Sequence, residues 1–189
     1  MPRALVLAGP NGAGKTTISR KVALGEYLDP DEVERGLINV GPVPVRPAAA
    51  GRQILRRMEE LVAAGADFST ETTLAGLSAT GRMRRWRAAG YHCTLIFVAL
   101  SDPDLAVQRV RGRVAQKGHG VPGGDDVVIR RWHGGLRQFF AEGMHIADSW
   151  LFLDNSDLEA LVVVAAGEGS EIQLFDPARW EAFRNAAGQ

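Results

Sequence analysis

The residues that most constrain the fold are Gly9 to Thr16, which read Gly-Pro-Asn-Gly-Ala-Gly-Lys-Thr. They follow the apolar run Ala4–Ala8, so a buried strand would lead directly into a glycine-rich turn. The spacing matches the phosphate-binding loop G-x-x-x-x-G-K-[ST], which lies between a strand and a helix. Glycine adopts positive φ at little cost, so such a turn can aim backbone N–H groups at phosphate oxygens. The sequence therefore predicts a nucleoside triphosphate site directly after the first strand.

Two side chains at the end of this loop indicate how the triphosphate would be held. Lys15 is expected to reach the β- and γ-phosphates, and the Thr16 hydroxyl to take one position on Mg²⁺. The helix that follows adds the positive end of its dipole. The predicted ATP-binding residues of the loop are Gly9, Pro10, Asn11, Gly12, Ala13, Gly14, Lys15, Thr16 and Thr17, with Thr16 as the metal ligand.

Length and composition narrow the class of protein. The chain has 189 residues, which fits one domain over residues 1–189. Its formal net charge is zero, which argues against a nucleic-acid partner. No apolar stretch approaches the ~20 residues of a membrane span. The single cysteine, Cys93, lies in an apolar run and suits a reducing compartment. We therefore expect a cytoplasmic protein without a membrane partner.

Strand-like and helix-like segments alternate along the chain. Strands are expected at Arg3–Ala8, Tyr27–Leu28, Ala66–Thr70, Tyr91–Leu100 and Trp150–Leu153. Helices are expected at Lys15–Leu24, Ala48–Ala64, Ser78–Ala89 and Asp125–Glu142. Two more helix starts are expected, one at Asp29–Glu32 and one at Ser101–Asp104, where Ser101 or Asp102 is the cap and the helix continues to about Gln116. A terminal hairpin and helix are expected at about residues 159–187, with the helix at Pro177–Ala187. Such alternation after a phosphate-binding loop predicts an α/β fold, a kinase-like parallel sheet with helices on both faces.

Acidic residues at the expected strand ends are the first candidates for chemistry. The chain has neither the Asn-Lys-x-Asp of GTPases nor a Leu-Ser-Gly-Gly-Gln-like transporter signature, and ligands of open α/β sheets bind at the carboxyl ends of strands. Asp31 could accept the proton of an attacking substrate hydroxyl, or it could cap a helix. Glu71, with Thr72 and Thr73, could order Mg²⁺-bound water or bind substrate hydroxyls, or form a surface turn.

Arginines are the second group of candidates. Arg109 and Arg113 lie four residues apart and so share a helix face, while Arg130 and Arg131 follow a glycine-rich loop. This arrangement is typical of a hinged helical lid, here about residues 109–131, that brings arginines to the transferring phosphate. The alternative is a solvated basic face.

Taken together, these motifs resemble the zeta-toxin-like P-loop kinases. The segments that carry the resemblance are Gly9–Thr17, Leu28–Glu32, Phe68–Leu74, Gly90-Tyr91, Arg109-Val110, Arg113-Val114, Gly118–Pro122, Arg130-Arg131 and Asp154–Ser156. The resemblance implies an α/β kinase fold, ATP with Mg²⁺, and phosphorylation of a UDP-N-acetylamino sugar such as UDP-N-acetylglucosamine at its 3′-hydroxyl. It also implies a small inhibitory antitoxin protein as a partner.

The resemblance also implies roles for individual residues. Asp31 takes the position of the general base, Lys15 and Thr16 the phosphate and metal positions, and Glu71 a substrate-contact position beside Thr72 and Thr73. The catalytic lid arginines fall among Arg109, Arg113, Arg130 and Arg131, and Asn155 would lie near the adenine.

Two departures from the family pattern leave the identity of the acceptor substrate open. Relatives often carry Arg-Ser-Leu where this chain has Gly134-Gly135-Leu136, so a basic contact is expected to be lost. The chain is also shorter than the larger zeta toxins, so the acceptor could be another hydroxyl compound. The alternatives are a nucleotide-binding switch that acts through a protein partner, or an RNA 5′-hydroxyl kinase, against which the neutral charge argues.

Overall fold

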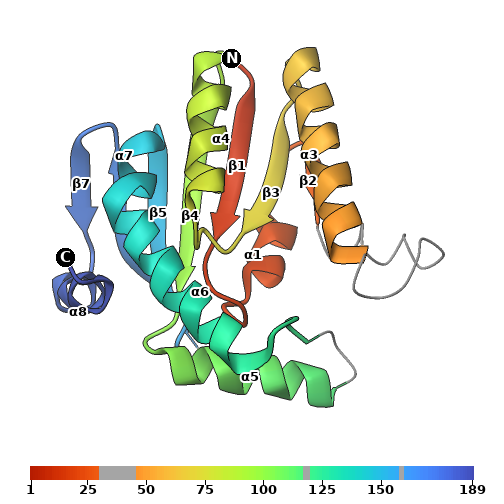
Figure 1. Cartoon of the computed structure of the whole chain (residues 1–189). Coiled ribbons are helices and arrows are strands. Elements are labelled where there is room, and N and C mark those ends of the chain that lie inside the picture. The colour runs from red at the N-terminus through yellow and green to blue at the C-terminus, as the bar shows by residue number, and fades with distance from the viewer. Residues whose placement is uncertain (30–45, 117–119, 158–159) are drawn as a thin grey trace.

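The computed structural model describes residues 1–29, 46–116, 120–157 and 160–189. Within these residues, seven strands form one sheet in the order β2-β3-β1-β4-β5-β6-β7 (Figure 1). The strands are β1 (Arg3–Ala8), β2 (Glu26–Leu28), β3 (Phe68–Thr72), β4 (His92–Ala99), β5 (Ser149–Asp154), β6 (Val162–Glu168) and β7 (Glu171–Leu174).

The first five strands are parallel, and β6 and β7 join them in antiparallel fashion. The predicted α/β class and kinase-like sheet are thus confirmed, with a terminal antiparallel hairpin. The parallel pairing brings the carboxyl ends of β1, β3, β4 and β5 to one edge of the sheet, the edge where ligands of such sheets bind.

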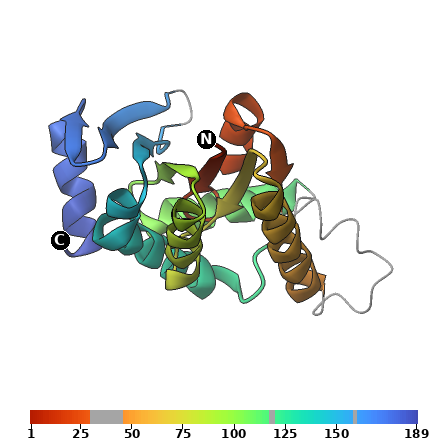
Figure 2. The same cartoon turned by 90° about the horizontal axis from the view of Figure 1, so that it is seen from above.

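Helices lie on both faces of the sheet (Figures 1 and 2). One face carries α4, whose Trp86 packs edge-on against Phe68 of β3. The other carries α1, whose Ser19 reaches Tyr27 of β2. The helices are α1 (Lys15–Val22), α3 (Arg46–Ala64), α4 (Leu77–Ala88), α5 (Pro103–Ala115), α6 (Gly124–Gln138), α7 (Met144–Ile146) and α8 (Pro177–Ala187).

Most element boundaries agree with the sequence expectations to within two residues, and the ends of β3 and α6 show two informative differences. The third strand continues to Thr72, because β3 stays in register with β1 as far as the pair Ala8 and Thr72. The helix expected to end at Glu142 instead changes into a π-helical turn, Phe139–Gly143, before α7. The expected cap at the start of α5 is Asp102, whose Oδ1 accepts the Leu105 N–H at 2.8 Å.

An aromatic cluster joins the C-terminal helix to the sheet. Phe139 contacts Phe97 of β4 and Phe152 of β5, with ring centroids 5.0 and 4.9 Å apart. Trp180 of α8 stacks on Trp150 of β5, with centroids 5.7 Å apart and planes 12° from parallel. Such pairs bury large apolar areas, so α8 is firmly docked through its rings.

The segment predicted to form a lid, about residues 109–131, includes the second half of α5 and the first half of α6. Helix α5 lies beyond the carboxyl ends of the strands (Figure 1). Arg111 of α5 pairs with Asp125 of α6 and so links the two helices. Among the described residues, no helix combines the length and apolar character that a membrane crossing requires.

The pair Gly134-Gly135 has a packing role that the sequence did not reveal. A Cβ on Gly135 would lie 2.5 Å from the Thr73 carbonyl oxygen, and one on Gly134 would lie 2.9 Å from that of Ala75. The two glycines therefore let α6 approach the turn after β3 at a distance that no larger residue permits.

Replacing Gly135 with alanine should therefore destabilise the fold. We expect the Gly135→Ala free energy of unfolding to fall by about 1–3 kcal/mol, because the new methyl group overpacks a backbone contact. Gly112 of α5 is the matched control, because a Cβ there meets nothing within 4 Å; Gly112→Ala should gain about 1 kcal/mol from helix propensity. Urea denaturation measures both, and equal stability of the two variants would contradict this packing account.

Candidate active site

The phosphate-binding loop has the backbone geometry that the motif requires. Gly9, Gly12 and Gly14 have φ of 137°, 82° and 85°. A residue with a side chain would be strained at these values. Space is also restricted, because a Cβ on Gly9 would lie 2.2 Å from the Val98 carbonyl oxygen. The loop therefore needs glycine for both its dihedral angles and its contacts.

The Lys15 side chain folds back over this loop. Its Nζ donates hydrogen bonds of 3.0 Å to the carbonyl oxygens of Gly9 and Pro10. The ammonium group therefore lies over the loop, and its expected contact with the β- and γ-phosphates stays a prediction. Gly14 caps α1 in the left-handed conformation, so the helix N-terminus opens toward the same place.

Thr16 and Glu71 meet beside the loop. The Thr16 hydroxyl donates to Glu71 Oε2 at 3.4 Å, and the Tyr27 hydroxyl donates to Glu71 Oε1. Ser19 of α1 in turn donates to the Tyr27 oxygen at 3.0 Å. The carboxylate of Glu71 is thus oriented from two sides and lies next to the hydroxyl predicted to bind the metal.

Strand register explains this cluster. Glu71 lies opposite Leu7 of β1, and Tyr27 lies opposite Ser69 of β3, so Glu71 and Tyr27 project toward the α1 face. Burial, followed by the hydrogen bond to Glu71, raises the pKa of Tyr27 above its usual value. The phenol therefore keeps its proton at neutral pH and remains a donor to the carboxylate.

The two threonines after Glu71 form a strained turn. The Thr72 hydroxyl accepts the backbone N–H of Leu74 at 3.1 Å. Leu74 has φ of 55° and is buried, a conformation that costs about 1–2 kcal/mol for a residue with a side chain. The structure thus places Thr72 and Thr73 next to Glu71, with the Thr72 hydroxyl engaged by the turn itself.

The four candidate arginines separate by position. Arg131 is partly buried and donates to the Asn11 side-chain oxygen in the phosphate-binding loop at 3.1 Å. Burial, and secondarily the neighbouring Arg130, lowers the pKa of Arg131, although a guanidinium remains charged. Arg109 donates to the Ser156 carbonyl oxygen at 2.8 Å. Arg113 and Arg130 are exposed.

The residues Asp154, Asn155 and Ser156, here called the Asp154–Ser156 turn, lie against the phosphate-binding loop. Asn155 Nδ2 donates to the Ala13 carbonyl oxygen at 2.9 Å. A Cβ on Gly14 would lie 2.7 Å from the same nitrogen. Asn155 therefore lies at the loop, and its expected position near the adenine stays a prediction.

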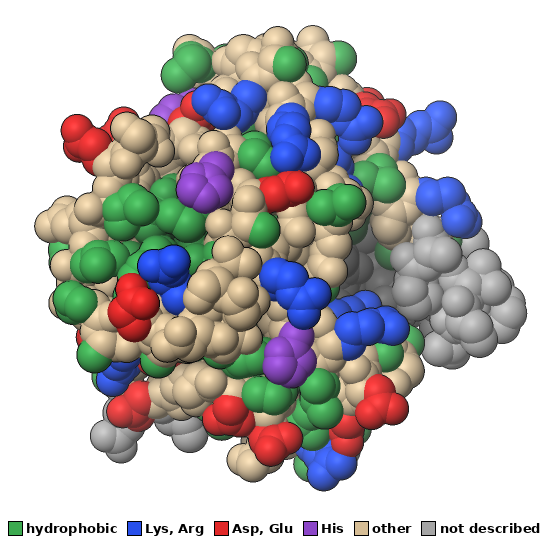
Figure 3. Space-filling model, turned by 60° about the vertical axis from the view of Figure 1, so that its left-hand side comes forward, with side chains coloured by type: hydrophobic (Ala, Val, Ile, Leu, Met, Phe, Trp, Pro, Cys, Tyr) green, Lys and Arg blue, Asp and Glu red, His purple; other side chains and the backbone are tan. Residues whose placement is uncertain are grey.

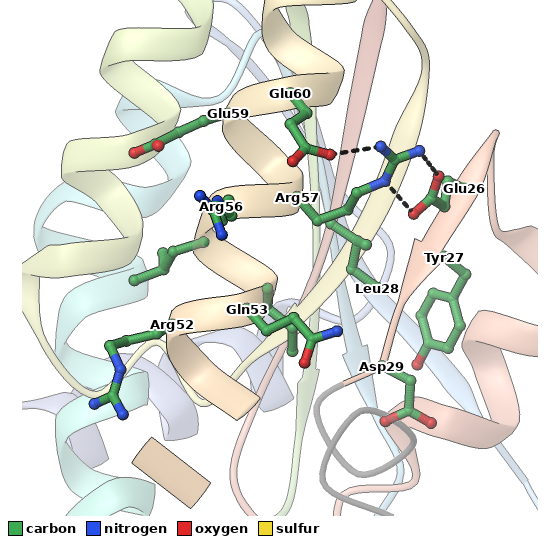
Figure 4. A pocket seen from close by; sticks show the side chains of 12 residues that line it. Glu26, Tyr27, Leu28, Asp29, Arg52, Gln53, Arg56, Arg57, Glu59 and Glu60 are labelled. Atoms are coloured by element: carbon green, nitrogen blue, oxygen red, sulfur yellow. Dashed lines mark hydrogen bonds and ion pairs between the residues drawn. The ribbon is translucent and has the colours of Figure 1, made fainter. Parts of the chain in front are cut away.

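A separate pocket of about 1180 Å³ lies between β2 and α3 (Figure 4). Tyr27 and Asp29 line its strand side. Arg57 of α3 links the two walls through Glu26 of β2 at 2.8 Å, and it also pairs with Glu60 of its own helix at 2.7 Å. The pocket adjoins the cluster around Glu71, since both include Tyr27, but it is distinct from the phosphate-binding loop.

Asp31, the predicted general base, lies outside the described residues, as does the helix expected to begin there. Sequence reasoning missed Tyr27 as a site residue, because 44 positions separate it from its partner Glu71. It also missed Arg179, whose guanidinium pairs with Asp154 at 3.0 Å. Neither residue belongs to a motif, so only the fold reveals these contacts.

Comparisons with known proteins agree with this architecture. No family model matches the sequence. An uncharacterised protein of Haemophilus influenzae is 25% identical over 134 residues, which are 69% of this chain and 92% of that protein. A structure from the PezAT chromosomal toxin–antitoxin system of Streptococcus pneumoniae has a TM-score of 0.62 at 16% identity, over 98% of this chain and 78% of that one.

A second solved structure, the AvrRxo1-ORF1:ORF2 complex with ATP, has a TM-score of 0.69 at 14% identity. It matches 97% of this chain, which spans 63% of that chain's length. The fold and the loop together define a P-loop kinase architecture. More narrowly, the chain shares its fold with these two solved structures, which agrees with the resemblance seen in the motifs at the level of the fold.

Proposed function

We propose that this protein is an ATP-dependent kinase that transfers the γ-phosphate to a hydroxyl of a small metabolite, with a UDP-N-acetylamino sugar as the leading acceptor. The observation that carries the proposal is the cradle at the end of β1. Gly9, Gly12 and Gly14 all have positive φ, Lys15 lies over the loop, and α1 begins at Lys15 directly after its cap Gly14. The similar AvrRxo1-ORF1:ORF2 complex was crystallised with ATP, which supports the same nucleotide here.

The residues around Thr16 fit a bound Mg²⁺. Mg²⁺ in kinases is commonly held by one or two protein oxygens together with phosphates and waters. The Thr16 hydroxyl and the Glu71 carboxylate, which already contact each other at 3.4 Å, would hold it. When bound, the ion neutralises charge on the phosphates. Of the roles considered for Glu71, this contact favours the one on the metal side.

The acceptor hydroxyl would enter from the β2 side. Asp29 lines the pocket beside β2. Asp31, two residues further along the sequence, is proposed as the general base because the family resemblance gives it that role. A carboxylate there would accept the proton of the hydroxyl as its oxygen attacks phosphorus. Glu71, Thr72 and Thr73 lie at the carboxyl end of the neighbouring strand β3 and would line the acceptor site from that side.

Arginine chemistry at the transferring group is assigned to Arg131. Its guanidinium is already held at the phosphate-binding loop through Asn11, whereas Arg130 is exposed. A positive charge at this position would stabilise the charge that spreads over the phosphoryl oxygens in the transition state.

A protein partner is also part of the proposal. The PezAT structure comes from a toxin–antitoxin system. We propose that a comparable small inhibitory protein binds this chain and blocks its nucleotide or acceptor site. A nucleic-acid substrate is less well supported. Acidic as well as basic side chains lie on the face shown in Figure 3, and Arg84 and Arg87 of α4 pair with Glu142 and Asp148.

The test is a transfer assay with labelled ATP and Mg²⁺ against a panel of UDP-sugars. We expect a new labelled product with UDP-N-acetylglucosamine in the wild type and none with Asp31→Ala. Asp31→Ala should bind ATP normally, because the role proposed for Asp31 is on the acceptor hydroxyl and not on the triphosphate. Transfer by Asp31→Ala at the wild-type rate would contradict its assignment. ATP binding without transfer to any panel member would remove the sugar nucleotide as acceptor.

The two adjacent lid arginines provide a matched pair of variants. We expect Arg131→Ala to lower kcat by about 10³-fold, the range measured for arginines that act on transferring phosphates. Arg130→Ala, which changes the neighbouring exposed side chain, should retain nearly the wild-type kcat. Steady-state kinetics with the acceptor found above compares them. A larger loss in Arg130→Ala would show that the closed lid uses the other arginine.

A further inference from the structure

We infer that Arg179, in the C-terminal helix α8, is a positioning residue for the nucleotide site, which it holds in place through the Asp154–Ser156 turn. The inference rests on the proposed ATP binding. Nothing in the sequence motifs points to α8, because the resemblance to known kinases ends near Ser156. The connection appears only in the side-chain contacts of the folded chain.

The chain of contacts begins at a buried carboxylate. Asp154, the last residue of β5, is 5% exposed. Its Oδ2 accepts a hydrogen bond from Arg179 Nη1 at 3.0 Å. Its Oδ1 accepts the Ser156 backbone N–H at 2.9 Å and the Ser156 hydroxyl. A buried carboxylate needs such partners, and Arg179 supplies the opposite charge.

Each residue of the Asp154–Ser156 turn contacts a different element. Asp154 binds α8 through Arg179, and Asn155 donates to Ala13 in the phosphate-binding loop. The Ser156 carbonyl oxygen accepts a hydrogen bond from the Arg109 guanidinium of α5 at 2.8 Å. The Ser156 hydroxyl accepts one from the Ser101 N–H at 2.7 Å. The turn is therefore the point where α8, α5 and the loop meet.

Arg109 completes the connection on the other side of the loop. A Cβ on Gly12 would lie 3.1 Å from Arg109 Cβ and 3.0 Å from the Ala106 carbonyl oxygen. The α5 backbone thus packs directly on the phosphate-binding loop. A shift of the Asp154–Ser156 turn would move Asn155 and Arg109 together, and both of them touch the cradle.

Arg179 itself is held rigidly. Asp176 caps α8 by accepting the Arg179 N–H at 3.0 Å, and its other oxygen pairs with Arg179 Nε at 3.1 Å. The helix is docked independently, through the stack of Trp180 on Trp150. Removing the guanidinium should therefore leave α8 in place and loosen the turn, so the effect falls on nucleotide binding.

The test is calorimetric titration of the full chain with ATP and Mg²⁺. We expect Arg179→Ala to weaken ATP binding about tenfold, comparable to the loss of one hydrogen bond to a charged group. The matched control is Arg184→Ala on the same helix, whose exposed side chain pairs only with Glu181 at 3.5 Å among the described residues. Arg184→Ala should bind ATP like the wild type.

Kinetics and a rescue variant distinguish a positioning role of Arg179 from a general effect on the stability of the fold. Arg179→Ala should raise the KM for ATP and leave the KM for the acceptor unchanged, whereas general loosening would alter both. Arg179→Lys, whose ammonium can still pair with Asp154, should recover most of the lost affinity. If Arg179→Ala does not fold, the Lys variant is compared with Arg179→Gln, which keeps a donor without the charge and should bind more weakly.

The outcomes distinguish this inference from the proposed function. A wild type that binds no ATP would overturn the proposed function, and this inference with it. Normal wild-type binding together with equal ATP affinity in Arg179→Ala and Arg184→Ala would overturn the inference alone. Equally tight ATP binding by Arg179→Lys and Arg179→Gln would overturn it as well.

Discussion

Three glycines of the phosphate-binding loop each pack closely against a different part of the fold. Gly9 lies against Val98 of β4, Gly12 against Ala106 of α5, and Gly14 against the side chain of Asn155 after β5. The positive φ of these glycines turns the loop inward, and their missing side chains let the neighbours approach. The sheet order, the position of α5 and the turn after β5 thus converge on one cradle.

Two carboxylates flank this cradle, and each has its own set of donors. Glu71 is oriented by Thr16 and Tyr27 on the side of β2 and β3. Asp154 is oriented by Ser156 and Arg179 on the side of β5 and α8. Because catalysis of phosphoryl transfer depends on positioning and charge, we interpret the first as the metal side and the second as the nucleotide side.

Local sequence signals predict the elements, and long-range contacts cannot be read from them. The bounds of β1 and α8 agree with the prediction, because apolar runs and a proline after an aspartate mark them locally. The glycines of the phosphate-binding loop are predictable because backbone geometry requires them. At Gly134-Gly135 the sequence indicates only a lost basic contact, since nothing nearby in sequence shows that Thr73 packs on them. Tyr27 and Arg179 could not be predicted as site residues for the same reason, because their partners Glu71 and Asp154 are distant in the sequence.

The measurement that tests the account most directly is the ATP affinity of Lys15→Ala in the presence of Mg²⁺. Lys21 of the same helix is exposed and provides the matched control. If the loop is a triphosphate cradle, the wild type and Lys21→Ala bind ATP with equal affinity, and Lys15→Ala binds at least about tenfold more weakly, as loss of a hydrogen-bonding charge requires. Full ATP affinity in Lys15→Ala, or no binding by the wild type, would contradict the account.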